Sequence, residues 1–300
     1  MNWREEAVVF PCGDDELVGV FALPEQAGPR GVLIVVGGPQ YRAGSHRQFT
    51  LLSRYLAQRG IASLRFDYRG MGDSSGAART FEAASEDIRA AVDRLVERLP
   101  APREVVIWGL CDAASAALMY AQADPRVSGL ILVNPWVRTE AGLARAQLRH
   151  YYGARLLQVS FWQKLVQGEF KPARAARSFG ESLLRSIRRS RDHIGQPLPE
   201  RMEAGLRRFK GRVLLILSGK DLTAQEFNSL AAGSPGWQGL LREPRVTRFE
   251  MVEANHTFSR HDWREQVLSR TSAWLMQERA SEGSSGRGAG RNASLDDPKA

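Results

Sequence analysis

Residues 104–121 read EVVIWGLCDAASAALMYA, and this stretch decides the expected fold. An apolar run leads into the sequence GLCDA at 109–113, and an alanine-rich run that favours helix follows at once. The pattern predicts a buried strand, a sharp turn at Cys111 and a helix that begins directly after the turn. A strand that feeds straight into a helix is typical of α/β folds.

Cys111 occupies the place that a catalytic nucleophile takes at such a turn, where serine is the usual residue. Gly109, two residues before it, and Ala113, two residues after it, are small, as a strained turn close to neighbouring backbone requires. The helix that follows points its positive end at the sulfur and so favours the thiolate. The alternative is a small, inert cysteine at a strand end, so the partners of Cys111 decide between the two.

Two polar residues later in the chain supply such partners, in the order nucleophile, acid, histidine. Asp221 follows the apolar run RVLLILSG, and His256 follows RVTRFEMVE. Taken singly, Asp221 could instead cap a helix and His256 could be an ordinary surface residue. The competing acid is Glu226, and the competing base is His261, which we expect to open the last helix. The order and context of all three favour Cys111, Asp221 and His256 as the catalytic residues.

The loop after the third expected strand, VGGP at 36–39, matches the place of a loop that supplies one oxyanion donor. Gly38 can offer its backbone N–H, whereas Pro39 has none. The N–H of Asp112, directly after Cys111, would be the second donor. We therefore predict an oxyanion hole formed by Gly38 and Asp112.

Short apolar runs bounded by turn residues are predicted strands, and helix-length amphipathic segments separate several of them. The two clearest helices are expected at 46–60 and 81–99. The alternation predicts an α/β fold with a mostly parallel eight-stranded sheet and helices on both faces. Functional loops then lie at the carboxyl ends of the strands. The expected strands are 8–10, 17–23, 31–38, 61–68, 104–110, 127–135, 212–219 and 245–253.

The alternation breaks at 138–210, a helix-rich segment with 16 Lys plus Arg and 6 Asp plus Glu. The whole chain carries +9, so this segment contributes +10 and the remainder −1. We expect residues 1–137 and 211–280 to form one core and 138–210 to form a basic helical cap over the sheet edge. The polar, Gly/Ser-rich residues 281–300 are predicted to be a disordered tail.

The positive charge of the basic cap indicates which molecules the protein could bind. Because its charge lies on no recognisable nucleic-acid-binding module, nucleic acid is not expected. An anionic acyl or saccharide substrate is one interpretation, with Arg145, Arg149, Tyr151 and Tyr152 as candidate binding residues. Peripheral contact with anionic lipid is another. Ordinary solvated helices, with the aromatic residues in the core of the cap, remain the alternative.

Other features limit the class of protein. No apolar run approaches the length of a membrane-spanning helix, and the N-terminal residues lack the pattern of a secretory signal. The two cysteines, Cys12 and Cys111, lie far apart, which favours a reducing cytoplasm over a disulfide framework. The glycines of DYRGMGDS at 67–74 do not have the spacing of a nucleotide-binding loop. No cofactor and no metal are predicted.

Five segments together resemble the exosortase A system-associated hydrolase 1 family, a branch of the α/β hydrolases, and the similarity runs over about residues 5–280. They are VVGGPQYRAGSHRQF, LRFDYRGMGDSSG, VIWGLCDAASAALMYA, LVNPWVRTEAGLARAQLRHYY and LILSGKDLTAQEF. The resemblance implies an α/β-hydrolase fold, a cytoplasmic hydrolase and a link to exopolysaccharide and protein-sorting systems. It also implies that Cys111, Asp221 and His256 correspond to the nucleophile, acid and base of the superfamily.

The function that these observations predict is hydrolysis of an ester-like or thioester bond through an acyl-enzyme on Cys111. A thiolate nucleophile makes thioesters, lactones and activated esters better substrates than amides. The chain could also be an acyltransferase. A protein of a different class, a degenerate hydrolase that serves as a binding or scaffolding protein, is the second alternative.

Overall fold

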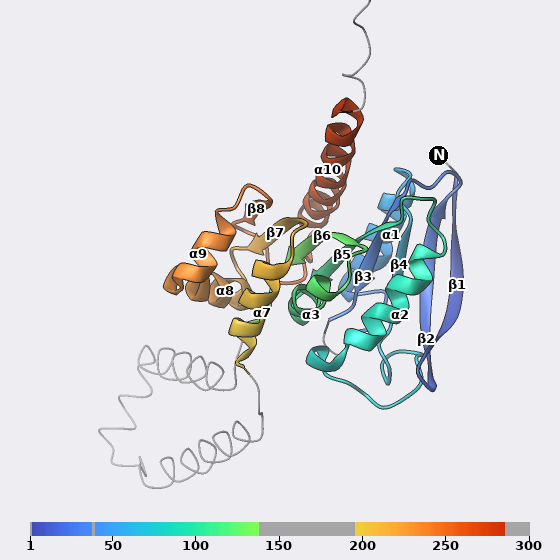
Figure 1. Ribbon diagram of the computed structural model, residues 1–300, viewed down its shortest axis with the longest axis horizontal. Coiled ribbons are helices and arrows are strands. Elements are labelled where there is room, and N and C mark those ends of the chain that lie inside the picture. Colours follow the sequence, from blue (N-terminus) through green and yellow to red (C-terminus); the bar gives the residue numbers. More distant parts are fainter. Residues whose placement is uncertain (1, 38–39, 138–195, 286–300) are drawn as a thin grey trace, which may run out of the picture.

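The computed structural model describes residues 2–37, 40–137 and 196–285, which form one eight-stranded sheet with helices on both faces (Figure 1). The strand order is β1-β2-β4-β3-β5-β6-β7-β8. β1 and β2 pair in antiparallel fashion, β2 is antiparallel to β4, and every later pair is parallel. The strands are Trp3–Cys12 (β1), Asp15–Pro24 (β2), Arg30–Val35 (β3), Ser63–Phe66 (β4), Glu104–Leu110 (β5), Val127–Val133 (β6), Arg212–Ser218 (β7) and Val246–Met251 (β8).

The helices divide between the two faces of this sheet. The α-helices are Gln48–Ala57 (α1), Ser85–Val96 (α2), Asp112–Tyr120 (α3), Leu198–Arg208 (α7), Leu222–Gly233 (α8), Pro235–Leu241 (α9) and His261–Ser285 (α10). Short 3-10 turns occupy Ser45–Arg47, Phe81–Ala83 and Ala121–Ala123. The prediction of a mostly parallel eight-stranded sheet between helical layers is confirmed.

Alternate residues of the central strands point into two separate apolar cores, as the two-residue period of a strand requires. On β3, Leu33 packs into a core with α2, α3, α7, α8 and α9, and Ile34 packs into a core with α1 and α10. On β5, Ile107 packs into the first of these cores and Trp108 into the second. Burial on both faces explains why these strands have nearly continuous apolar sequences.

Two expected boundaries differ from the structure. Residues 198–208, assigned to the end of the cap by their charge, form α7, whose buried Met202 and Leu206 belong to the core. Gly205 lies so close to α3 that a Cβ there would be 2.5 Å from the carbonyl oxygen of Leu118. The net charge of the segment did not predict that α7 packs on the core, because α7 carries its arginines on one face and its apolar residues on the other. At the other end, α10 continues to Ser285, past the expected start of the tail at 281.

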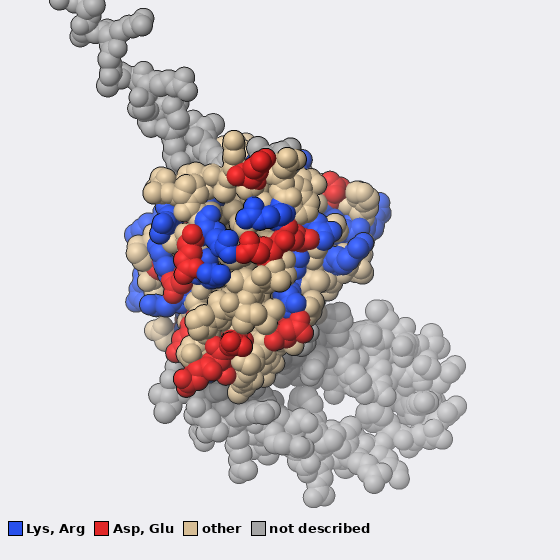
Figure 2. Space-filling view, turned by 90° about the vertical axis from the view of Figure 1, so that its right-hand side faces the viewer, with Lys and Arg blue, Asp and Glu red and all other residues tan. Residues whose placement is uncertain are grey.

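The charge of the described part is largely paired on its surface. Figure 2 shows acidic and basic side chains interspersed on the face that carries β1. Glu5 pairs there with both Arg54 and Arg65, and Glu6 pairs with Arg98. The excess of basic residues counted in the sequence falls mainly on 138–195, which lie outside the described residues together with Arg145, Arg149, Tyr151 and Tyr152.

Candidate active site at the carboxyl edge of the sheet

Cys111 lies at a strained turn between β5 and α3. Its φ of 63° and ψ of −125° are unusual for a residue with a side chain. The Cys111 N–H donates to the carbonyl of Val133 at 2.9 Å, which holds the turn against the end of β6. A Cβ on Gly109 would be 2.7 Å from backbone atoms of Ala113 and Ala114, so only glycine fits there. The predicted strand, turn and helix are confirmed.

The loop after β3 passes directly against this turn. A Cβ on Gly37 would be 2.2 Å from Oδ1 of Asp112 and 2.6 Å from the carbonyl oxygen of Leu110. The N–H of Asp112 belongs to the first turn of α3, where N–H groups point out of the helix start. Gly38, the other predicted oxyanion donor, lies outside the described residues.

Asp221, which lies between β7 and α8, accepts three hydrogen bonds. Its carboxylate caps α8 by accepting from the N–H groups of Thr223 at 3.1 Å and Ala224 at 3.3 Å. Nδ1 of His256 lies 2.8 Å from Oδ2 of the same carboxylate. The helix cap considered as an alternative for Asp221 is therefore present, and it orients the carboxylate toward His256.

The His256 ring is held between an acid and a thiol. The hydrogen bond with Asp221, and then one with Cys111, raise the pKa of His256 from 6.5 to about 10, although partial burial opposes the shift. Since Nδ1 faces Asp221, Nε2 is the ring nitrogen that faces Cys111. The structure thus brings Cys111, Asp221 and His256 together from three separate strand ends.

The competing residues lie elsewhere. His261 is exposed at the first position of α10. Glu226 lies within α8, and the carboxylate that bonds to His256 is that of Asp221. Among the described residues, no three His, Cys, Asp or Glu side chains are grouped as metal ligands would be.

Sequence reasoning missed two buried polar contacts next to this site. Arg42, in the loop after β3, pairs with the buried carboxylate of Asp67 after β4. Asn134, directly after β6, hydrogen-bonds to Ser218 at the end of β7. Their positions in the sequence could have indicated these contacts, since Asp67 and Asn134 each directly follow an apolar run that predicts a strand.

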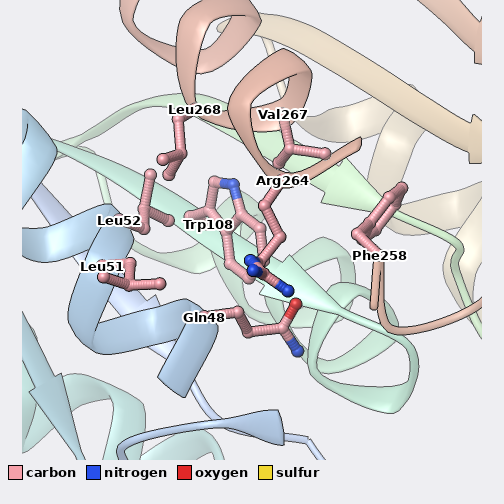
Figure 3. A pocket seen from close by; sticks show the side chains of 8 residues that line it. All are labelled: Gln48, Leu51, Leu52, Trp108, Phe258, Arg264, Val267 and Leu268. Carbon is pink, nitrogen blue, oxygen red and sulfur yellow. The ribbon is translucent and has the colours of Figure 1, made fainter. Parts of the chain in front are cut away.

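A small apolar pocket lies on the α1 and α10 side of the sheet (Figure 3). Trp108 of β5 forms its floor, and leucines of both helices form its walls. The side chain of Arg264 reaches across it toward Gln48. Phe258, two residues after His256, also contributes, but Cys111, Asp221 and His256 do not line this pocket. It is therefore distinct from the candidate active site.

Comparison with known proteins bears on the family and the fold. A model of the "Alpha/beta hydrolase family" matches residues 32–270. Over 92% of the chain, the structure is similar to the Pyrococcus furiosus esterase Pf2001, with a TM-score of 0.62, 16% identity and 93% of that chain covered. A dienelactone hydrolase from Anabaena variabilis gives a TM-score of 0.59 at 17% identity, covering 92% of this chain and 99% of that one. At such identities the likeness extends to the fold.

Similarity to curated proteins is confined to shorter segments. A polyketide transferase, grgF, from a Penicillium species is 30% identical over 100 residues, or 32% of this chain and 34% of its own length. A thiohydrolase, apmlB, from Arthrinium phaeospermum is 36% identical over 80 residues, 25% of this chain and 26% of its own. An acyltransferase, drtE, from Aspergillus calidoustus is 28% identical over 37% of each chain. The matched segments thus span about a third of these relatives. In the described part of the chain, no helix is long and apolar enough to cross a membrane.

Proposed function

Because the chain belongs to the alpha/beta hydrolase family, we propose that it cleaves ester-like or thioester bonds through an acyl-enzyme on Cys111. The observation that carries the proposal is that His256, hydrogen-bonded through Nδ1 to Asp221, interacts with Cys111 at the carboxyl edge of the sheet. The imidazolium that this arrangement favours is the partner that a cysteine nucleophile needs.

In the proposed first half-reaction, the Cys111 thiolate attacks the substrate carbonyl carbon. The new C–S bond moves the carbonyl electron pair onto oxygen, and the N–H groups of Asp112 and Gly38 stabilise that oxyanion. When the intermediate collapses, the bond to the leaving group breaks, and Nε2 of His256 gives its proton to the departing oxygen or sulfur. Cys111 then carries the acyl group as a thioester.

In the second half-reaction, neutral His256 accepts a proton from water as the water oxygen attacks the thioester carbonyl. Collapse expels the Cys111 sulfur as thiolate and releases the carboxylic acid. Asp221 keeps Nδ1 of His256 as the donor side of the ring throughout, so Nε2 always faces the chemistry.

The substrate class follows from the nucleophile. A thiolate is itself a good leaving group, so collapse of the intermediate returns the substrate unchanged unless the leaving group of the substrate is comparably good, in which case the acyl-enzyme forms. Thioesters, lactones and activated esters meet this condition better than amides. The name of one relative, a thiohydrolase, supports a thioester.

Transfer of the acyl group to an acceptor other than water is the second candidate, favoured by the names of the acyltransferase and the polyketide transferase. The chemistry on Cys111 is the same, and only the nucleophile of the second half-reaction changes. A scaffolding protein without catalysis would not acylate Cys111 at all.

The resemblance to the exosortase-associated branch supports a role beside exopolysaccharide or protein-sorting systems. The basic segment further supports an anionic substrate, with Arg145, Arg149, Tyr151 and Tyr152 as binding residues. If so, kcat/KM for an anionic thioester should fall with salt much more than for a neutral one. Replacing Arg145, Arg149 and Arg155 together with glutamine should remove that difference. Parallel salt profiles would speak against an anionic substrate.

The test of the central proposal is acyl trapping. The protein is mixed with p-nitrophenyl esters and acyl thioesters, quenched in acid, and measured as intact protein and as peptides. We expect the mass of one acyl group on Cys111, no adduct in Cys111→Ala, and an unchanged adduct in the control Cys12→Ala. The reaction is then repeated with added alcohols and amines. Free acid as the product indicates hydrolysis, whereas an acylated alcohol or amine indicates acyl transfer. Hydrolysis that persists in Cys111→Ala would overturn the proposal.

A further inference from the structure

We infer that Asn134 is a positioning residue that fixes the loop carrying His256 relative to the turn carrying Cys111. The inference rests on the proposed function and deepens it, because it assigns the alignment of nucleophile and base to a side chain outside the three reacting residues.

The amide of Asn134 joins three strand ends by direct hydrogen bonds. Its Oδ1 accepts from the backbone N–H of Ser218 at 2.8 Å. Its Nδ2 donates to Oγ of Ser218 at 2.9 Å and to the carbonyl oxygen of His256 at 3.3 Å. Oγ of Ser218 then donates to the carbonyl oxygen of Asn255 at 3.1 Å. The His256 loop is thus tied to the ends of both β6 and β7.

The residues on either side of Asn134 bind the nucleophile turn. Val133 accepts the N–H of Cys111 at 2.9 Å, and Trp136 donates its N–H to the carbonyl of Cys111 at 3.2 Å. Oγ of Ser115 in α3 donates to the carbonyl of Trp136 at 2.6 Å. One short segment, 133–136, therefore contacts both backbone polar groups of Cys111, and the Asn134 side chain within it contacts the backbone of His256.

Asparagine suits this position for two reasons. Its φ is 45°, in the left-handed region that asparagine tolerates better than most residues. Its amide also donates and accepts at once, whereas an aspartate of the same shape only accepts. Asn134 is fully buried and Ser218 is 2% exposed, so loss of one partner leaves the other without a substitute from water.

The effect expected from losing the amide donor is misalignment, because catalysis depends steeply on the placement of reacting groups. Asn134→Asp keeps the shape and the acceptor and removes the donor to His256. Ser218→Ala removes the hydroxyl and leaves Asn134 in place, so it serves if Asn134→Asp fails to fold. The matched control is Ser53→Ala, which breaks a buried 2.7 Å hydrogen bond to Oγ of Ser63 between α1 and β4.

Three measurements are made on wild type and these variants: Tm, kcat and KM for a thioester, and the rate of Cys111 alkylation by iodoacetamide from pH 5 to 11. We expect Asn134→Asp and Ser218→Ala to lower kcat by about 10- to 100-fold, with KM changed less. The pH profile of alkylation should shift, because it reports the contact between His256 and Cys111. Ser53→Ala should lower the Tm and leave both readouts unchanged.

Alkylation needs no substrate, so this readout tests the positioning of His256 even if the protein hydrolyses no ester. An alkylation profile in Asn134→Asp and Ser218→Ala that matches wild type would overturn the inference. The inference would also be overturned if Asn134→Asp and Ser218→Ala lost no more kcat than Ser53→Ala does at the same loss of Tm.

Discussion

The backbone N–H of Arg42 donates a 2.7 Å hydrogen bond to Oδ1 of Asp67, and the guanidinium of Arg42 pairs with Oδ2 of the same buried carboxylate. This contact ties the loop after β3, which passes against Cys111, to the turn after β4. A Cβ on Gly72 would be 2.2 Å from Oδ2 of Asp67, so the turn is closed tightly around the carboxylate. Burial also raises the pKa of Asp67, against the opposing effect of Arg42.

We expect Asp67→Asn to destabilise the protein by about 1 to 3 kcal/mol, because it breaks buried hydrogen bonds and leaves Arg42 paired only with the exposed Asp73. Hydrolysis should slow as well, since the loop after β3 loses its anchor. The control is Asp262→Asn, whose pair with Arg260 is exposed and which should leave the Tm nearly unchanged. Denaturant melts and ester turnover measure both effects, and equal melts for the two variants would contradict the expectation.

Gly109→Ala should lower the Tm and disrupt the turn at Cys111, because the added Cβ would lie 2.7 Å from rigid backbone of α3. The comparison is Gly239→Ala in α9, where nothing lies within 4 Å of the added Cβ. There, alanine should stabilise the protein by about 0.5 to 1 kcal/mol. Thermal melts of the two variants are therefore expected to move in opposite directions.

The two cysteines should react at very different rates. Cys111 is partly exposed and interacts with His256, whereas Cys12 is buried and its pKa is raised by that burial. At neutral pH, iodoacetamide should label Cys111 and spare Cys12, as peptide mass spectrometry would show. His256→Ala should slow the labelling of Cys111. Equal labelling of both thiols in the native protein would count against an activated Cys111.

Activity should fall on the alkaline side as the His256 imidazolium loses its proton. Its pKa of about 10 places that loss near pH 10. Asp221→Asn removes the first cause of the raised pKa, so the alkaline limb of kcat/KM should move toward the ordinary value of 6.5. A limb that stays in place in Asp221→Asn would show that another group sets it.

The same pKa makes stability depend on pH. A group whose pKa is raised by folding stabilises fully below its unfolded value and loses that contribution as pH rises through its folded value. The stability that His256 contributes should therefore be complete below about pH 6.5 and decline toward pH 10. Urea melts of wild type and His256→Ala should differ most at the lower pH, and a difference that grows with pH would contradict this.

The residues that could be predicted from the sequence are those placed by strand ends alone. Cys111, Asp221 and His256 each follow a continuous apolar run, so their presence at one edge needs only a parallel sheet. The contact between Asn134 and Ser218 could not be predicted in this way, because it depends on which strands are neighbours across 84 positions of sequence. The segment 198–208 was misassigned because a net charge does not record which face of a helix carries it.

Val137, shortly after β6, and Leu198, the first residue of α7, are both buried in the same apolar core. Changes to the sequence between these two residues would therefore leave both anchors in the core in place. The chain-entropy penalty of such a closed segment grows only by about 0.6 kcal/mol for each doubling of its length. A designer can thus exchange the residues between these two anchors while the hydrogen bonds around Asp221 and His256 stay as they are.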